Sequence, residues 1–284
     1  MKSLIIDEKY NHKKLNTVLQ SVFPDLSLNT IYKTLRKKDI KINGNRVSQD
    51  ILLHTGDKVD IYIVDSLLCP EKKLNIVYED EFILIVDKPS GIEVTGENSL
   101  TSLAKGKLLE SVYPCHRLDR NTSGLVLFAK TEDALSILLD KFKNSEISKH
   151  YACHVYGIPK EKKKTLTAYL FKDAKKSMVY ILDTPEKGYR KIITSYEVIE
   201  EFKDNTCILD VNLHTGRTHQ IRAHLAHIGL PIIGDGKYGK NEINKLFGVK
   251  TQKLCSYKLK FNFKEDSGIL NYLNHKEFNI EYHF

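Results

Sequence analysis

The sequence predicts an α+β protein in which a small α/β domain precedes a larger domain built on a mixed, largely antiparallel sheet with flanking helices. The 284 residues exceed the length of one typical domain. Residues 150–213 contain several short apolar strands with little helix between them, a succession that is typical of antiparallel or mixed sheets. We predict a small domain at 1–68, a linker at 69–74 and the large domain at 75–284.

Two amphipathic helices and a small sheet are expected in the first domain. Ser27 is placed to cap the second helix, Asn43-Gly44 predicts a hairpin turn, and the alternating apolar residues of 59–63 predict a strand. The predicted apolar faces are Leu15, Val18, Leu19, Val22 and Phe23 in the first helix, and Leu28, Ile31, Tyr32 and Leu35 in the second.

Charge is concentrated in this first domain. The whole chain carries a net charge of +8, which is compatible with RNA, DNA or an anionic membrane as partner. Residues 13–46 contain eight basic and two acidic side chains, whereas an ordinary solvated helix face usually interleaves both signs. The helix, helix, hairpin and Gly-Asp-Lys-Val pattern resembles the small RNA-binding module, of the alpha-L type, first seen in a small-subunit ribosomal protein. That resemblance implies an RNA-binding face made of Lys33, Arg36, Lys37, Lys38, Lys41 and Arg46.

The sequence shows no secretory signal and no apolar run long enough to span a bilayer, so we expect a cytoplasmic protein without membrane attachment. The five cysteines form no Cys-x-x-Cys pair. Neither a disulfide framework nor a thiolate zinc site is therefore expected.

The segment His116 to Lys130, HRLDRNTSGLVLFAK, surrounds one carboxylate with cationic side chains. In an extended backbone, Arg117 and Asp119 would lie on one side and Leu118 would point toward the core. The turn residues 121–124 and an apolar run then place Asp119 at the edge of a buried sheet. The alternative is an exposed ion-pair cluster, which is common and contributes little stability.

A second polar segment spans 213–239. A helix is predicted over 217–228, with Ile221, Leu225 and Ile228 as its buried stripe and Arg222 at the edge, where it can reach a carboxylate. His214, His219, His224 and His227 raise the possibility of a metal site, but no carboxylate ligand accompanies them and His-Glu-x-x-His is absent, so hydrogen-bonding or packing roles are favoured. The glycines of 229–239 do not match a nucleotide-binding fingerprint.

These motifs together resemble the RluA-type pseudouridine synthases. The resemblance rests on 116–125, on Tyr151 after Lys149, and on 214–222, and it extends from about residue 75 to the end. Segments 80–91, 229–239 and 254–261 also match, although Cys255-Ser256 stands where the family usually has His-Ala. The resemblance implies a pseudouridine synthase fold and an enzyme that isomerises uridine in RNA with neither cofactor nor metal.

The resemblance also implies roles for individual residues. Asp119 would be the nucleophile, adding either to the uracil ring or to the sugar, and Arg222 would pair with it. Tyr151 would pack against the target base and help to remove the ring proton. Arg117 would enter the gap left by the flipped nucleotide, or instead clamp a phosphate. Further substrate contacts are expected from His116, Arg120, Leu213, Arg217, His219 and Gln220.

Because an RNA-binding module precedes the catalytic domain, the chain resembles family members that act on large-subunit ribosomal RNA. Transfer RNA is the alternative target. Two other hypotheses are an RNA-binding or ribosome-assembly factor with a vestigial catalytic domain, and a metal-dependent hydrolase built on the histidines. We expect a monomer.

Overall fold

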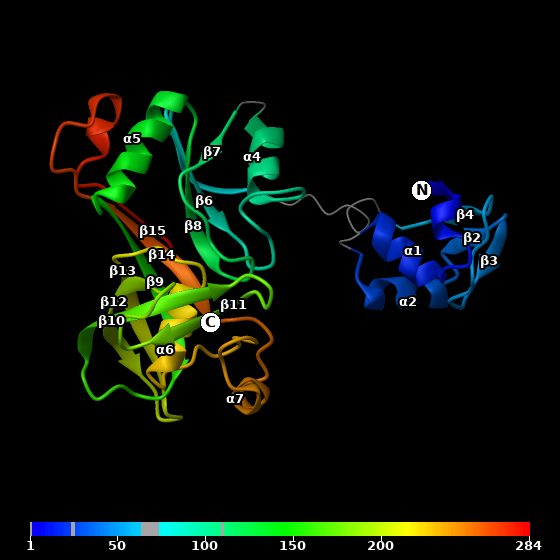
Figure 1. Ribbon diagram of the computed structural model, residues 1–284. Coiled ribbons are helices and arrows are strands. Elements are labelled where there is room, and N and C mark those ends of the chain that lie inside the picture. Colours follow the sequence, from blue (N-terminus) through cyan, green and yellow to red (C-terminus); the bar gives the residue numbers. More distant parts are fainter. Residues whose placement is uncertain (1, 24–25, 64–73, 109–110) are drawn as a thin grey trace. The chain divides into compact units, whose positions relative to one another are not determined.

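The computed structural model describes residues 2–23, 26–63, 74–108 and 111–284 (Figure 1). The chain divides into two compact units, Met1–Lys73 and Leu74–Phe284. Apart from Leu74, the predicted linker at 69–74 lies outside the described residues.

The described part of the first unit contains two α-helices and a four-stranded antiparallel sheet in the order β1-β4-β2-β3 (Figure 1). Its elements are β1 (Lys2–Ile5), a 3-10 turn η1 (Glu8–Tyr10), α1 (Leu15–Val22), α2 (Leu28–Arg36), β2 (Ile40–Ile42), β3 (Asn45–Val47) and β4 (Lys58–Ile61). As predicted, the Ser27 hydroxyl caps α2 by accepting a hydrogen bond from the Thr30 amide.

The predicted apolar face of α2 is partly wrong. Ile31 and Leu35 are buried, but Leu28 and Tyr32 are each 43% exposed. The buried stripe of α2 includes Thr34 instead. Its hydroxyl donates a hydrogen bond to the Thr30 carbonyl, so this buried polar group has a partner.

The second unit is built on one large mixed sheet. The sheet has eleven strands among the described residues. Nine of them follow the order β11-β10-β12-β13-β9-β14-β8-β6-β5, while β15 pairs with β14 and β7 pairs with β8. Only the β8–β14 pair is parallel among them, which confirms the predicted mixed, largely antiparallel sheet. The strands are β5 (Asn75–Glu79), β6 (Ile83–Lys88), β7 (Tyr113–Pro114), β8 (Ser123–Ala129), β9 (Ile147–Tyr156), β10 (Lys163–Asp173), β11 (Met178–Leu182), β12 (Arg190–Glu201), β13 (Thr206–Leu213), β14 (Leu254–Phe261) and β15 (Glu277–Asn279).

Helices flank this sheet, as predicted (Figure 1). They are α4 (Leu100–Leu108), α5 (Glu132–Lys143), α6 (Gln220–His227), α7 (Asn241–Leu246) and the 3-10 helix η2 (Gly268–Leu273). Helix α5 packs against β8 and β9, and α6 packs against β11 and β12. No helix in the described part of the chain is long and apolar enough to cross a membrane.

Two details of the predicted helical stripes are wrong. Apolar periodicity also predicts a helix capped by Thr131, with a buried stripe of Leu135, Leu138, Leu139 and Phe142. Leu139 of α5 is 47% exposed, because the buried side of this helix is formed by Ala134, Leu138 and Lys141. Ile228 is 36% exposed, because α6 ends at His227 and the chain turns away there.

The backbones of β8 and β14 approach each other closely where β8 begins. Gly124 stands opposite Ser256 on β14, and Ser256 in turn stands opposite Tyr151 on β9. Gly124 has a φ of 108°, and a Cβ atom there would lie 2.3 Å from the Ser256 carbonyl oxygen. Glycine is therefore required at this position both by conformation and by space.

We predict that Gly124→Ala lowers the free energy of unfolding by about 3 kcal/mol, since strain and a backbone clash add at this position. Chemical denaturation measures the change. Gly106→Ala is the matched control, because Gly106 lies in α4 and a Cβ atom there would have no neighbouring heavy atom within 4 Å, so that helix propensity should raise stability by up to about 1 kcal/mol. A Gly124→Ala protein as stable as this control would contradict the account.

Candidate active site

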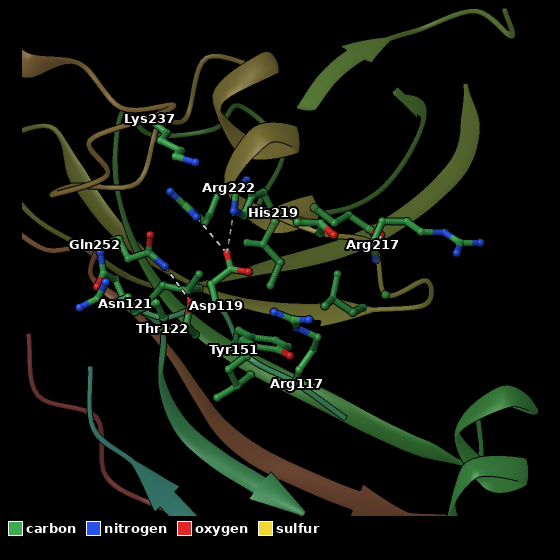
Figure 2. Close-up of a pocket in the computed structure, with 18 of the residues that line it drawn as sticks. Arg117, Asp119, Asn121, Thr122, Tyr151, Arg217, His219, Arg222, Lys237 and Gln252 are labelled. Carbon is green, nitrogen blue, oxygen red and sulfur yellow. Dashed lines mark hydrogen bonds and ion pairs between the residues drawn. The ribbon is translucent and has the colours of Figure 1, made fainter. Parts of the chain in front are cut away.

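The two polar segments of the sequence line one cavity of about 680 Å³. Residues 116–122 form one part of its wall, and residues 216–222 of the segment that leads into α6 form another. In Figure 2, Asp119 lies at the centre of the cluster, with Arg222 and His219 on one side and Tyr151 on the other.

The turn that carries Asp119 is anchored on both sides. Leu118 is buried in the core, and the Thr122 amide donates to the Asp119 carbonyl over 3.0 Å. The Thr122 hydroxyl accepts a hydrogen bond of 2.7 Å from Gln252, which Figure 2 also shows. The Asp119 side chain remains 25% exposed, so its carboxylate is accessible from the cavity.

Lys88 fixes the same turn through hydrogen bonds to backbone carbonyls. Its side chain is fully buried, and its ammonium donates to the carbonyls of Pro89, Ile92 and Arg120 over 2.9 to 3.0 Å. Burial lowers the pKa of Lys88 to about 8. Because three acceptors use all three ammonium protons, the group is charged at neutral pH and ties the residue after Asp119 to β6.

Arg222 joins two carboxylates. Its Nη1 donates to Asp119 Oδ2 over 2.9 Å, while Nε and Nη2 form a two-pronged contact with Asp235 over 2.7 and 2.9 Å. Asp235 is 1% exposed and also accepts from the amides of Lys237 and Tyr238. Asp119 Oδ1 has no hydrogen-bond partner among the described residues, so this oxygen can contact a ligand in the cavity.

The buried pair is held in its charged form. Burial opposes the charge on Arg222, but the bonds to Asp235 and Asp119 outweigh it and raise the guanidinium pKa above its ordinary value. Burial likewise opposes the charge on Asp235, but Arg222 and the two amides lower the pKa of this carboxyl overall. The pair therefore places a fixed cation beside Asp119.

Tyr151 lines the cavity from β9 and is 4% exposed. Burial, with a smaller contribution from the charge of Asp119, raises the pKa of its phenol well above the ordinary value. The side chain is consequently a neutral phenol at physiological pH, with an aromatic face available for packing.

The four histidines of the second segment contact different partners. His214 bonds to Ser195, His219 to Tyr238, His224 to Thr194 and His227 to Asp183. Within the described ranges, no group of three or more His, Cys, Asp and Glu side chains is placed to hold a metal ion.

Three of the predicted contact residues, Arg117, Leu213 and Arg217, line the cavity, and neither arginine side chain forms a hydrogen bond with another described residue. Arg117 and Arg217 are exposed, and Leu213 is partly buried. In Figure 2, Arg117 lies on the Tyr151 side of Asp119, whereas the guanidinium of Arg217 points away from it. Arg117 is thus the better placed of the two to meet a base beside Asp119.

Three other predicted contact residues also line the cavity but have structural partners. Arg120 Nε donates to the Gly91 carbonyl, and His116 Nε2 accepts from the Leu127 amide. Gln220 is 2% exposed, and its amide is fully used by Thr215, the Arg217 amide, Ile193 and Thr194. Gln220 therefore has no donor or acceptor left for a substrate and braces the loop before α6 instead.

The predicted RNA-binding residues of the first unit form an unneutralised group of cations. Lys33, Arg36, Lys37, Lys38 and Arg46 are exposed and Lys41 is partly exposed. None of the six forms an ion pair with another described residue, and the Lys41 ammonium lies 5.2 Å from the centre of the Tyr62 ring. The charge on this surface is free to meet an anion.

Four residues in or behind the cavity wall were given no role from the sequence. Asp235 and Tyr238 were noted only as part of the segment 213–239, Lys88 only within 80–91, and Lys149 only as a neighbour of Tyr151. Lys149 has a pKa lowered to about 8 by burial, and its ammonium lies 4.3 Å from the centre of the Phe142 ring. The available signal was nearness in sequence to the motifs, since Lys149 comes two residues before Tyr151, and Asp235 and Tyr238 lie in the same polar segment as Arg222.

Comparison with known proteins gives concordant results. Residues 82–227, just over half of the chain, match the family described as RNA pseudouridylate synthase. The ribosomal large subunit pseudouridine synthase C of Vibrio vulnificus is 33% identical over 256 residues, which cover 82% of this chain and 79% of that protein. The corresponding protein of Buchnera aphidicola from Baizongia pistaciae is 31% identical over 262 residues, with 85% and 82% covered.

Solved structures show the fold. The human RNA pseudouridylate synthase domain containing 4 aligns with a TM-score of 0.60 at 19% identity, covering 73% of this chain and 88% of that one. The human RNA pseudouridylate synthase domain containing 1 aligns with a TM-score of 0.59 at 22% identity, covering 69% and 81%. The predicted pseudouridine synthase fold is thereby confirmed.

We predict that Asp235→Asn destabilises the protein by about 3 kcal/mol or more at pH 7, because it leaves Arg222 buried with part of its charge uncompensated. The lowered pKa of Asp235 means that its contribution is present above the ordinary carboxyl pKa of about 4 and is lost as pH falls through the folded-state value. The stability difference between wild type and variant should therefore shrink as the pH falls below about 4.

Urea denaturation at several pH values measures this difference. Asp183→Asn is the control, because the Asp183 side chain is 81% exposed and contacts only His227 among the described residues, so its removal should cost less than about 0.5 kcal/mol. Equal effects of the two substitutions at pH 7 would refute the buried pair as a main source of stability.

Proposed function

The chain belongs to the RNA pseudouridylate synthase family, and on that premise we propose that it isomerises uridines of large-subunit ribosomal RNA with Asp119 as nucleophile and without a cofactor. The observation that carries the mechanism is the free Oδ1 of Asp119 beside a cation that two carboxylates hold in place. The relatives named as large-subunit ribosomal pseudouridine synthases support the choice of RNA.

The reaction is an isomerisation. The N1–C1′ bond of uridine breaks, a C5–C1′ bond forms, one proton leaves C5 and one proton is gained at N1, so no redox partner is required. A carboxylate can start this sequence by adding to the ring or by attacking C1′, and the same oxygen, Asp119 Oδ1, serves either route. The cavity geometry supports a nucleophile at this position without choosing between the routes.

Arg222 keeps this carboxylate in place inside a partly apolar cavity. Its contact with Asp119 offsets the cost of removing the carboxylate from water. The guanidinium also binds Asp235, so the cluster of Arg222, Asp119 and Asp235 contains one cation and two anions and has a net negative charge. Arg222 thus holds the Asp119 side chain in place, and the excess of anions in the cluster favours its nucleophilic character.

Tyr151 is proposed to pack against the target base. Its burial supports a neutral aromatic ring as one wall of the base pocket. Because a neutral phenol is a weak base, removal of the C5 proton by Tyr151 requires that the phenol pass on its own proton. The observed environment therefore supports the packing role more strongly than the role in proton removal.

Arg117 is proposed to act where the nucleotide leaves its stack. A nucleophile cannot reach a base inside a helix, so the target must be extruded into the cavity. The exposed Arg117 lies beside Tyr151 at the rim and has no hydrogen-bonded partner among the described residues (Figure 2). Arg117 can either occupy the position that the flipped nucleotide leaves or contact a phosphate.

The first unit is proposed to supply affinity for RNA. Six of its basic side chains are exposed or partly exposed and form no ion pair with another described residue, which supports binding to the RNA backbone with sequence-independent and salt-dependent affinity. A cytoplasmic location and a monomeric state remain our expectations for this protein.

We predict that Asp119→Asn lowers the rate of pseudouridine formation by at least about 10³-fold, because the amide keeps the shape of the side chain but cannot act as the nucleophile. The purified full-length protein is incubated with large-subunit ribosomal RNA, and nucleosides are separated after digestion. Asp183→Asn serves as the control and should retain the wild-type rate.

A wild-type rate in Asp119→Asn would eliminate the proposed nucleophile. Activity of the wild type on transfer RNA but not on ribosomal RNA would instead reject the proposed substrate and leave the nucleophile in place. A wild type that binds RNA but forms no pseudouridine would favour the vestigial RNA-binding factor.

We also predict that changing Lys33, Lys37, Lys38 and Lys41 together to Gln reduces the salt slope of RNA binding by about 3, since each phosphate contact contributes about 0.7 for single-stranded RNA. The rate at saturating RNA should stay the same. Filter binding between low and moderate salt measures the slope.

The control removes the same charge from the second unit, through Lys143, Lys203, Lys264 and Lys276, all of which are exposed. If both sets of substitutions lower the slope equally, net charge rather than the first unit accounts for the affinity.

A further inference from the structure

We propose that His219 is a neutral positioning residue whose Nε2–H faces the nucleophile, and that Tyr238 sets this tautomer. The inference deepens the proposed function, because it takes Asp119 as the nucleophile. The sequence predicted only a substrate contact for His219, and it gave no role to Tyr238.

The tautomer follows from the donors around Tyr238. The Val179 amide lies 2.9 Å from the Tyr238 hydroxyl oxygen, and a backbone N–H can only donate. The phenol oxygen therefore accepts from Val179, and its own proton is available to His219 Nδ1, which lies 2.8 Å away. A neutral imidazole that accepts at Nδ1 must carry its proton on Nε2.

That proton faces the nucleophile. His219 Nε2 lies 3.9 Å from Asp119 Oδ2, which is slightly beyond hydrogen-bond distance, and Arg222 already donates to this same oxygen. Arg222 thus donates to Oδ2 and His219 Nε2 lies near the same oxygen, whereas Oδ1 has no hydrogen-bond partner among the described residues. A carboxylate with one restrained oxygen and one free oxygen presents a defined atom to the substrate.

The environment favours the neutral imidazole. Burial is the main cause that lowers the pKa of His219, and the charges of Arg222 and Lys237 act in the same direction, against the opposing effect of Asp119 and Asp235. A neutral donor orients the carboxylate without adding a second full positive charge. Such a charge would reduce the nucleophilicity that the reaction requires.

Tyr238 contacts both partners of Asp119. Its ring lies edge-on to the His219 imidazole with centroids 5.6 Å apart, and the Arg222 guanidinium carbon lies 5.3 Å from the centre of the same ring. His219 itself has a φ of 54°, a left-handed conformation that is unfavourable for residues other than glycine. The contacts with Tyr238 thus fix a strained residue in the orientation that brings Nε2 to the cavity.

The test uses the full-length protein and the variant Tyr238→Phe, which keeps the ring beneath Arg222 and removes only the hydroxyl. Nitrogen-15 NMR of labelled histidine, without RNA, reports the tautomer of His219 directly. We expect the Nε2–H form at pH 7 in the wild type and a mixture of tautomers in Tyr238→Phe. We further expect kcat to fall about tenfold while KM changes less than about twofold, because orientation rather than binding is lost.

Two further variants complete the experiment. His219→Asn tolerates a left-handed backbone but is too short to replace the imidazole, so it should lose activity to a similar extent. The double variant should lose no more than either single one, because the two residues act as one unit. Tyr180→Phe is the matched control, since Tyr180 is 40% exposed and its hydroxyl has no hydrogen bond among the described residues, and it should behave as wild type.

An Nδ1–H tautomer or an imidazolium at pH 7 in the wild type would overturn the proposal. So would a full kcat in Tyr238→Phe, or losses that add in the double variant. Because the tautomer is measured without substrate, a wild type that forms no pseudouridine would reject the proposed function and leave the NMR result to be judged separately.

Discussion

The guanidinium of Arg222 is shared between the buried carboxylate of Asp235 and the accessible carboxylate of Asp119, and the rest of the candidate site depends on that sharing. Asp235 binds two of its nitrogens and is itself held by two backbone amides, so the cation cannot rotate away from Asp119. Removing either buried charge would leave the other uncompensated, which costs several kcal/mol. The stability of the loop after α6 and the placement of the proposed nucleophile thus depend on the same interaction.

The sheet brings the other components to this cation. Gly124, Ser256 and Tyr151 lie in one row across β8, β14 and β9, so the turn before β8 and the tyrosine of β9 reach the same cavity, although they are distant in sequence. Lys88 then fixes the turn through the Arg120 carbonyl, and Gln252 fixes it through the Thr122 hydroxyl. Asp119 is accordingly a side chain on a short turn whose backbone is held at several points, which suits a residue that must meet a substrate in a defined orientation.

Much of this could be predicted from residue patterns. Apolar periodicity and turn residues predicted the mixed sheet, the caps at Ser27 and Thr131, and a helix with Arg222 at its edge. The same periodicity failed at Leu28, Leu139 and Ile228, because one period cannot tell which side of a short helix meets its neighbour or where the helix ends. Asp235 was not predicted, since an irregular loop carries no periodic signal and its partner Arg222 is close to it only in three dimensions. Gln220 was predicted to contact substrate, but its four hydrogen bonds, two to the loop before α6 and two to β12, could not be inferred from its place in a motif.

Mapping of pseudouridines in total RNA tests the central claim most directly. Cells that lack the gene are compared with cells complemented by the wild type or by Asp119→Asn. We expect specific positions in large-subunit ribosomal RNA to lose pseudouridine without the gene, to regain it with the wild type, and not to regain it with the variant. Restoration by Asp119→Asn would exclude Asp119 as the nucleophile, and a loss confined to transfer RNA would exclude ribosomal RNA as the substrate.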